Sequence, residues 1–452
     1  MGHIFGTDGV RGIANIAPMT VEDVLRIGRA TAYVCKRHGT EGIRQKIVIG
    51  KDTRVSGYML ENALTAGICS MGVDVLLLGP LPTPGIAFIT QSMRADAGLV
   101  LSASHNPYMD NGIKIFSRTG NKLPDAEEAE IEELINSGRI RDIRPTADEV
   151  GRAKRIDDAI GRYIVFCKSS FPDDLTLDGL RIVVDCSNGA TYKVAPVIFY
   201  ELGAEVFAIH NKPDGININA NCGSQHTEDL RAKVLETQAD LGLAFDGDGD
   251  RLIAVDETGQ ELSGDHIVAI TAAFMKRSGT LAGNRVVTTV MSNFGLHQFL
   301  KKEGIQHVES AVGDRHVLEK MKETGAILGG EASGHIIHLD HHTTGDGIIA
   351  ALQLLVTRVR TAKRLSVLAS GMTLTPQTII NVNVTDKPPL EGLEDLQQAM
   401  QKADEELGGE GRQLVRYSGT QSMCRIMVEG PTGEMTNRLA NELADIVKRC
   451  IG

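Results

Sequence analysis

Three segments of the chain share one pattern, and this pattern restricts the fold more than any other feature of the sequence. In each segment a short apolar stretch runs directly into a polar loop rich in glycine or serine. The segments are ADAGLVLSASHNP from Ala95, ADLGLAFDGDGD from Ala239 and TGAILGGEASGH from Thr324. In open α/β sheets, ligands bind at the carboxyl ends of the strands. The pattern therefore predicts three related α/β domains that present their loops to a shared central cleft.

Alternating strand and helix signals support this prediction. The apolar strand 47–49 leads into a stretch in which Leu60, Leu64 and Ile68 share one helical face, and residues 73–78 are typical of the next strand. The same order recurs in residues 181–208 and 285–308. Such repeats predict mixed or parallel sheets with helices on both faces.

The C-terminal part has a different pattern, which predicts a smaller α+β domain. Residues 378–384 and 424–428 alternate between apolar and polar side chains, and a helical pattern begins near Asn437. We expect domain junctions near Arg155, Asp256 and Gly371. The predicted domains are residues 1–155, 156–256, 257–371 and 372–452.

The composition argues against several classes of protein. The 452 residues carry a formal net charge of −11, which disfavours a nucleic-acid-binding face. No apolar run is long enough to cross a bilayer, and the N-terminus lacks the pattern of a secretory signal. The seven cysteines form no CxxC motif and are typical of reduced thiols, with a zinc or redox role as the minor alternative. We therefore expect a cytoplasmic protein with no nucleic-acid or membrane partner.

Asp246, Asp248 and Asp250 form the strongest chemical signal. They follow the buried-type strand 241–245, and the glycines between them allow the three carboxylates to converge. Two unit charges 4 Å apart repel by about 4 kcal/mol at an effective dielectric of 20, so the group needs a counterion. Oxygen ligands favour Mg²⁺ or Ca²⁺ over zinc. A solvated acidic turn is the alternative, whereas an EF-hand is disfavoured because Arg251 stands where that loop needs glycine.

The other two loops of the repeated pattern also carry candidate side chains. Ser104 beside His105 is a candidate nucleophile, although turn and helix-cap chemistry explains the loop equally well. Lys114 is a candidate cation or base, or else a surface charge. Glu331 and Ser333 suit sugar hydroxyls, with a structural turn as the alternative.

Two further segments are rich in donors for an anion. Residues 416–420 and Arg425 supply two guanidinium groups and two hydroxyls that suit a phosphate, unless they form an arginine-decorated turn. The glycine-rich stretch 5–12 carries Arg11. By contrast, Gly345–Ala350 indicates a helix start rather than a dinucleotide site. His338, His341 and His342 indicate a polar surface loop rather than a metal site.

Together these motifs resemble the α-D-phosphohexomutase superfamily, and most closely its bacterial members that act on glucosamine phosphate. The resemblance spans essentially the whole chain. It rests on the ordered motifs FGTDGVRG, DTRVSGYMLE, SASHNP, DGDGDR, GEASGH and RYSGT.

The resemblance implies a role for each loop. Ser104 is expected to carry a phosphate and to hold one Mg²⁺ together with the three aspartates. Glu331 and Ser333 are expected to bind sugar hydroxyls. The residues expected around the non-reacting phosphate are Arg416, Ser418, Gly419, Thr420 and Arg425. Those expected around the transferring phosphoryl group are Arg11, His105, Lys114 and Arg251, with Lys114 and His335 as candidates for proton transfer.

The sequence departs from the superfamily's usual pattern in two loops. Gln421 and Ser422 stand where Glu-Pro usually follows the phosphate loop, and Ala332 stands where glucosamine-specific members usually have Gln. The second departure bears on the identity of the sugar, because that loop is expected to touch it.

The implied reaction is the interconversion of glucosamine 6-phosphate and glucosamine 1-phosphate through glucosamine 1,6-bisphosphate. It would feed UDP-N-acetylglucosamine and peptidoglycan precursor synthesis. The alternatives are a mutase for mannose or glucose phosphate, a phosphatase with Asp246 as nucleophile, and a non-catalytic sugar-phosphate sensor. The sequence leaves a homodimer open.

Overall fold

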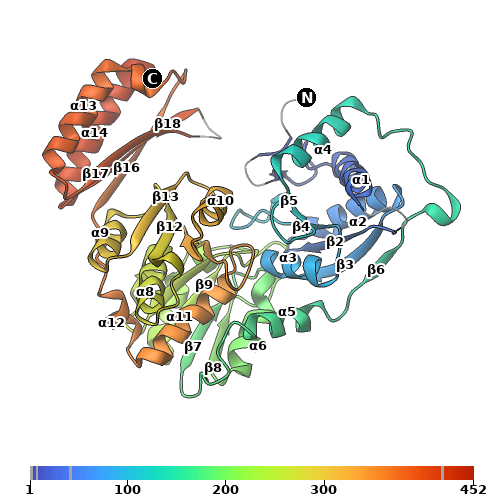
Figure 1. Ribbon diagram of the computed structural model, residues 1–452, viewed down its shortest axis with the longest axis horizontal. Coiled ribbons are helices and arrows are strands. Elements are labelled where there is room, and N and C mark those ends of the chain that lie inside the picture. The colour runs from blue at the N-terminus through green and yellow to red at the C-terminus, as the bar shows by residue number, and fades with distance from the viewer. Residues whose placement is uncertain (1–3, 7–8, 40–42, 419–421) are drawn as a thin grey trace. The chain divides into compact units, whose positions relative to one another are not determined.

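The computed structural model describes residues 4–6, 9–39, 43–418 and 422–452. The chain divides into two compact units. Unit 1 comprises Met1–Val290 and Val308–Ala369, and unit 2 comprises Met291–His307 and Ser370–Gly452. Figure 1 labels many of the elements of each unit.

The first sheet of unit 1 has the strand order β1-β5-β4-β2-β3-β6. Strands β2, β3, β4 and β6 run parallel, whereas β5 pairs antiparallel with both β4 and β1, so the sheet is mixed. Its strands are β1 (Val10–Ile13), β2 (Lys46–Lys51), β3 (Asp74–Pro80), β4 (Ala97–Leu101), β5 (Asp110–Ser117) and β6 (Ala153–Arg155). The accompanying helices are α1 (Val21–His38), α2 (Ser56–Cys69), α3 (Thr83–Ser92) and α4 (Asp125–Ser137).

The second sheet of unit 1 has the order β11-β10-β9-β7-β8, with β7, β8 and β9 parallel. Its strands are β7 (Arg181–Asp185), β8 (Glu205–Ile209), β9 (Leu241–Phe245), β10 (Leu252–Asp256) and β11 (Glu261–Leu262). The helices of this part are α5 (Ala159–Lys168), α6 (Val194–Glu201) and α7 (Glu228–Thr237).

The third sheet has the order β13-β12-β14-β15. Its strands are β12 (Arg285–Thr289), β13 (Gln306–Ser310), β14 (Leu328–Gly330) and β15 (Ile336–His338). The neighbouring helices are α8 (Gly264–Arg277), α10 (Asp314–Thr324), α11 (Gly347–Thr361) and α12 (Leu365–Ala369). The loops that carry Ser104, Asp246 and Glu331 follow β4, β9 and β14, so the predicted placement of the three special loops at strand ends is confirmed.

Unit 2 is a small α+β body built on the antiparallel sheet β16-β18-β17. Its strands are β16 (Gln377–Asn383), β17 (Arg412–Tyr417) and β18 (Met423–Glu429), and its helices are α9 (Phe294–Lys302), α13 (Glu394–Leu407) and α14 (Gly433–Ile451). The buried Glu429 ties α9 to this sheet by accepting from the Phe294 backbone N–H at 3.2 Å and from Arg412 at 2.7 Å.

Apolar burial explains why the strands that precede the three loops form the interior. Leu99, Leu243 and Leu328, one on each of these strands, are fully buried. Burial of one such side chain stabilises a fold by about 1.5–3 kcal/mol. The strands therefore hold the polar loops at their ends in fixed positions.

Two local expectations need correction. His338 and His342 are buried rather than part of a polar surface loop, and only His341 is partly exposed. His342 is buried because both its ring nitrogens have partners: Nδ1 accepts from the Thr343 N–H at 2.7 Å, and Nε2 lies 3.0 Å from the Pro84 carbonyl oxygen. The C-terminal helix begins at Gly433 rather than near Asn437, because the Thr432 side chain caps it by accepting from the Met435 N–H.

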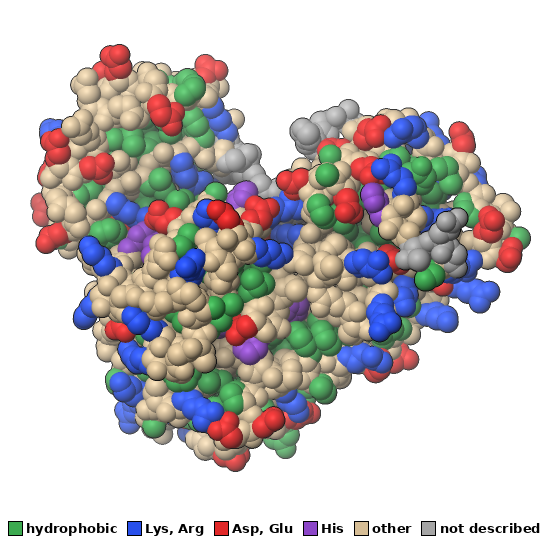
Figure 2. Space-filling view, in the orientation of Figure 1, with side chains coloured by type: hydrophobic (Ala, Val, Ile, Leu, Met, Phe, Trp, Pro, Cys, Tyr) green, Lys and Arg blue, Asp and Glu red, His purple; other side chains and the backbone are tan. Residues whose placement is uncertain are grey.

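Acidic and basic side chains are intermingled on the face of the molecule seen in Figure 2. The helices of the described residues include none with the length and apolarity needed to cross a bilayer.

Candidate active site

Ser104 lies in the loop that follows β4 and is 3% exposed. Its backbone is left-handed (φ 51°), a conformation that is uncommon for residues other than glycine. The hydroxyl of Ser102 holds this turn by accepting from the Ser104 N–H at 2.9 Å. The Ser104 hydroxyl donates to Asp246 Oδ2 at 2.7 Å and lies 3.2 Å from Nδ1 of His105. The loop therefore places the Ser104 hydroxyl against Asp246, Asp248 and Asp250, which are called the aspartate group below.

Arg54 holds the backbone of the serine loop, and it was not singled out from the sequence. Its side chain is fully buried, and Nε donates to Asp52 at 2.8 Å. Nη2 donates to the carbonyl oxygens of Ser104 at 2.9 Å and Asn106 at 2.8 Å, and Nη1 donates to those of Pro107 and Asp110. One guanidinium group thus fixes the backbone of the whole turn, which Lys could not do because it lacks the planar fork.

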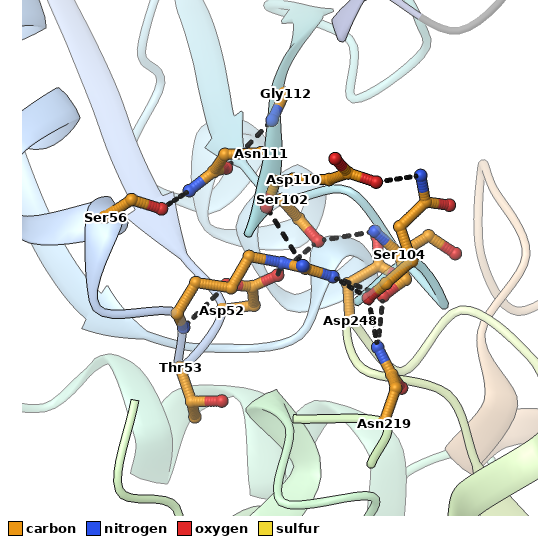
Figure 3. Close-up of polar contacts among 12 residues, drawn as sticks. Asp52, Thr53, Ser56, Ser102, Ser104, Asp110, Asn111, Gly112, Asn219 and Asp248 are labelled. Carbon is orange, nitrogen blue, oxygen red and sulfur yellow. Dashed lines mark hydrogen bonds and ion pairs between the residues drawn. The ribbon is translucent and has the colours of Figure 1, made fainter. Parts of the chain in front are cut away.

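Contacts between the first two sheets fix the serine loop relative to the aspartate loop. The Asn219 side chain donates to the Ser104 carbonyl oxygen at 2.8 Å, as Figure 3 shows. The Thr83 hydroxyl donates to Asp248 Oδ2 at 2.7 Å, and the Thr83 N–H donates to the Asp248 carbonyl oxygen at 2.9 Å. These uncharged residues position the site and have no sequence signature of their own.

The aspartate group has the donor set of a cation site. One carboxylate oxygen from each of Asp246, Asp248 and Asp250 lies within 4.8 Å of the others, and all three residues are buried. Oδ1 of Asp248 and Oδ1 of Asp250 are buried without a hydrogen-bond partner among the described residues. Buried carboxylate oxygens that lack donors are costly unless a cation binds them, so these residues fit a hard divalent metal ion.

Lys114, on β5, supplies the nearest positive charge. Its Nζ lies 3.1 Å from Asp248 Oδ2 and 3.3 Å from Asp250 Oδ2, and its side chain is buried. Burial raises the pKa of Asp246 well above its usual range, and the neighbouring Asp248 and Asp250 raise it further. Burial would also raise the pKa of Asp250, but Lys114 and His335 hold it well below its usual range. Asp246 and Asp250 are therefore in opposite electrostatic environments.

His105 and His335 have opposite electrostatic environments. Burial, together with Arg251 and Arg11, lowers the pKa of His105 to about 4. Burial would also lower the pKa of His335, but Asp250, Asp314 and Glu331 raise it to about 9. Nδ1 of His335 lies 3.7 Å from Asp250 Oδ1, so a protonated imidazole is held beside the aspartate group.

The loop that follows β14 in the third sheet contacts the loop of the aspartate group. His335 of the former pairs with Arg251 of the latter in an isolated antiparallel bridge. Oε1 of Glu331 accepts from the Gly313 N–H at 3.0 Å, and the Ser333 hydroxyl lies 3.4 Å from Oε2. A cavity of about 400 Å³ opens beside His335 and is also lined by Lys122 and Asp314, which form an ion pair at 2.6 Å. Neither Lys122 nor Asp314 was singled out from the sequence.

The predicted phosphate-binding residues lie in unit 2. Arg416 and Arg425 are cross-strand partners on β17 and β18, and their Nε atoms are buried without a hydrogen-bond partner in the described part of the chain. Burial, and next the charge of Arg425, lowers the pKa of Arg416. Lys387 adds a third cation by donating to the Ser418 carbonyl oxygen at 2.7 Å. Gly419 and Thr420 lie outside the described residues.

Comparison with protein families matches the chain along nearly its full length. Four models of phosphoglucomutase/phosphomannomutase match: α/β/α domain I over residues 2–141, domain II over 162–259, domain III over 263–374 and the C-terminal domain over 379–446. Among solved structures, a phosphoglucomutase/phosphomannomutase family protein from Burkholderia thailandensis superimposes with a TM-score of 0.81. It is 26% identical, and the match covers 99% of this chain and 97% of the other.

An N-acetylphosphoglucosamine mutase from Aspergillus fumigatus, solved with GlcNAc-6P and magnesium, shares the fold. Its TM-score is 0.66 at 16% identity, over 98% of this chain and 95% of the other. Curated relatives are closer in sequence. Phosphoglucosamine mutase of Syntrophus aciditrophicus is 57% identical over the whole of both chains. That of Geobacter sp. strain M21 is 58% identical over all of this chain and 99% of the relative. The chain therefore belongs to the phosphoglucosamine mutase family of the α-D-phosphohexomutase superfamily.

Proposed function

We propose that this protein interconverts glucosamine 6-phosphate and glucosamine 1-phosphate through a phosphorylated Ser104. The observation that carries the proposal is the 2.7 Å hydrogen bond from the Ser104 hydroxyl to Asp246, inside a buried group of three aspartates and Lys114. Full-length relatives at 57–58% identity that are named phosphoglucosamine mutase support the choice of substrate. Such a reaction would supply amino-sugar phosphate in the cytoplasm.

The residues that would hold Mg²⁺ are Asp246, Asp248 and Asp250, together with a phosphate on Ser104. When bound, Mg²⁺ neutralises negative charge that builds up on the phosphoryl oxygens during transfer. An oxygen-only donor set with unpartnered carboxylate oxygens supports this ion over zinc.

The proposed transfer breaks the bond between phosphorus and Ser104 Oγ and forms a bond between phosphorus and a free sugar hydroxyl oxygen. That hydroxyl loses its proton, and Ser104 Oγ regains one. In the second half-reaction the other phosphate of the bisphosphate intermediate returns to Ser104. Lys114 is ion-paired with two carboxylates, and this environment suits a fixed positive charge better than a base. The raised pKa of His335 suits a proton donor.

We assign sugar binding to Glu331 and Ser333. Binding of the non-reacting phosphate falls to Arg416, Ser418, Gly419, Thr420 and Arg425, with Lys387 added. Arg11, His105 and Arg251 would surround the transferring group.

We also propose domain junctions near Arg155, Asp256 and Gly371. Closure of the last domain on a hinge near Gly371 predicts that solution scattering changes when bisphosphate saturates the enzyme.

The decisive experiment compares the 1-phosphates of glucosamine, glucose and mannose in a coupled assay with catalytic bisphosphate and Mg²⁺. We expect the highest kcat/KM for the glucosamine compound. Equal or faster turnover of the mannose compound would overturn the substrate assignment. Mass spectrometry separates the mutase from an aspartate phosphatase, because phosphoserine at Ser104 survives acid whereas an acyl phosphate at Asp246 does not.

A further inference from the structure

A second group of metal-ligating side chains lies outside the candidate active site, in the second sheet of unit 1. Asp185 is the last residue of β7, His210 directly follows β8, and Cys222 lies in the loop before α7. One ligand atom from each lies within 4.8 Å of the other two. Asp185 and Cys222 are buried, and His210 is partly buried.

The two ring nitrogens of His210 have different surroundings. Nδ1 lies 3.0 Å from Asp185 Oδ2, but the contact lacks hydrogen-bond geometry, and Nδ1 is buried without a hydrogen-bond partner among the described residues. Nε2 lies 3.2 Å from Oδ2 of Asp229, whose side chain is exposed. A histidine that binds a metal through one nitrogen is commonly held by a carboxylate at the other.

We propose that Asp185, His210 and Cys222 bind a divalent transition-metal ion of the zinc type. A set of one thiolate, one imidazole and one carboxylate fits such an ion, and it does not fit Mg²⁺, which prefers oxygen ligands alone. The ligand atoms are Cys222 Sγ, His210 Nδ1 and an Asp185 carboxylate oxygen, and a fourth position is left for water. Binding replaces the thiol proton of Cys222 with the metal and releases that proton to solvent. Asp229 is a positioning residue that orients the imidazole.

The alternative is a metal-free network in which His210 bridges Asp185 and Asp229 while Cys222 only fills space. That network would be expected to form a well-aligned hydrogen bond from Nδ1 to Asp185, whereas the two atoms lie 3.0 Å apart as an ion pair without hydrogen-bond geometry. It also gives no reason for the Cys222 sulfur to converge on the same point. Both observations favour the metal site.

The ion would brace loops that support the candidate active site. Asp185 also accepts from the Gly223 N–H at 2.9 Å and from the Ser187 N–H at 2.8 Å. From the same loops, the Ala190 N–H donates to the Gly247 carbonyl oxygen at 2.8 Å, and Asn219 reaches the Ser104 carbonyl oxygen. The site is therefore structural, and its occupancy would change the rigidity of the serine and aspartate loops.

The test is a Co²⁺ titration of the full-length protein, first treated with a chelator and then saturated with Mg²⁺. We expect one equivalent of Co²⁺ to give a thiolate-to-cobalt charge-transfer band. The band should vanish in Cys222→Ser and persist in Cys186→Ser, a buried cysteine outside the group that serves as the matched control. It should also persist in Asp248→Asn, which alters only the aspartate group. Asp229→Asn should weaken Co²⁺ binding by about 10- to 100-fold.

The absence of a charge-transfer band in the wild-type protein would overturn the proposal, whatever the variants do. Survival of the band in a folded Cys222→Ser variant would do the same. If circular dichroism shows that Cys222→Ser does not fold, His210→Gln takes its place and must lose the band. Mutase activity with Mg²⁺ is measured separately, so a failure of this proposal is distinguishable from a failure of the proposed function.

Discussion

The Ser104 hydroxyl donates a 2.7 Å hydrogen bond to Oδ2 of Asp246, although the two residues are 142 positions apart and follow strands of different sheets. A phosphate on that oxygen carries about −1.5 to −2 charges at neutral pH. It would stand directly against a buried carboxylate. The phosphorylated protein should therefore depend on a cation more strongly than the unmodified protein does.

Replacement of Ser104 by Ala removes the proposed phosphate acceptor. We expect kcat to fall by at least roughly 10³-fold, because the hydroxyl that faces the aspartate group is lost. Binding of glucosamine 1,6-bisphosphate, measured by calorimetry, should persist. Ser102→Ala is the matched control. It removes the hydrogen bonds of the Ser102 hydroxyl with the Ser104 N–H and with Asp52 but leaves the Ser104 hydroxyl, so it should keep the phosphate and lose activity only partly. Unchanged turnover in Ser104→Ala would exclude the covalent route.

Removal of the metal should lower stability as well as activity. We expect Mg²⁺ at about 100 times its Kd to stabilise the wild-type protein by about 2.7 kcal/mol, because the ion binds only the folded state. Scanning calorimetry should show a larger rise in Tm for the phosphorylated protein than for the phosphatase-treated one. Asp248→Asn should lose most of this response. An equal Mg²⁺ response in both phosphorylation states would contradict a shared ion between Ser104 and the aspartates.

Arg54→Lys tests whether the buried guanidinium holds the serine loop. Lysine keeps the charge beside Asp52, but it cannot serve the four backbone carbonyl oxygens that Arg54 contacts. Asn219 still donates to two of these oxygens, those of Ser104 and Asn106. An unsatisfied acceptor costs about 1–3 kcal/mol and at most two are left, so we expect a loss of unfolding free energy on the order of 3 kcal/mol. Urea denaturation measures it. Arg139→Lys, at an exposed ion pair with Glu133, is the control and should leave the midpoint unchanged.

The same residue shows what could be predicted from the sequence. The loops at strand ends were predictable because an apolar run followed by glycine-rich polar residues is a local pattern, as for Asp246 after β9. The role of Arg54 was not predictable, because four of its acceptors are backbone carbonyl oxygens in residues 104–110, and carbonyls have no sequence signature. Asn219 and Thr83 escaped notice for a similar reason, since a single uncharged polar residue does not indicate its partner.

The histidines near residue 340 show the opposite error. Their polar character predicted a surface loop, yet His338 and His342 are buried. For His342, sequence polarity fails because a neutral imidazole whose nitrogens both have partners can be buried at little cost. Those partners are the Thr343 N–H and the Pro84 carbonyl oxygen, and the second is 258 positions away.

The arginine pair of unit 2 predicts separate effects on binding and stability. Arg425→Gln removes a charge-assisted donor, and such bonds contribute about 1.5–3 kcal/mol. We therefore expect KM to rise by about 10- to 100-fold. Unfolding free energy should not fall, because the change also removes repulsion from Arg416, its cross-strand partner. Arg438→Gln, on the exposed face of α14, is the control and should change neither KM nor turnover. An unchanged KM in Arg425→Gln would remove this residue from the phosphate site.

The buried His342 should make the protein less stable in acid. Nδ1 accepts from the Thr343 N–H, so Nε2 carries the proton and donates to the Pro84 carbonyl oxygen at 3.0 Å. Protonation of Nδ1 would break the first of these bonds. Burial is the main cause that lowers the pKa of this residue from 6.5 to about 4. Below pH 6.5 the unfolded chain takes up a proton that the folded protein does not, so stability falls as the pH drops from 6.5 toward 4.

One pKa unit corresponds to about 1.4 kcal/mol, so His342 should account for a loss of about 3 kcal/mol across this range. Urea denaturation at intervals between pH 7 and pH 4 measures the effect as the difference between the wild-type protein and His342→Asn. The variant should be less stable at pH 7, and the two curves should approach each other as the pH falls. His316→Asn, at an exposed position, controls for the general effect of acid and should run parallel to the wild type. Parallel curves for His342→Asn would show that the imidazole has the same pKa in the folded and the unfolded protein, and would contradict the lowered pKa on which the prediction rests.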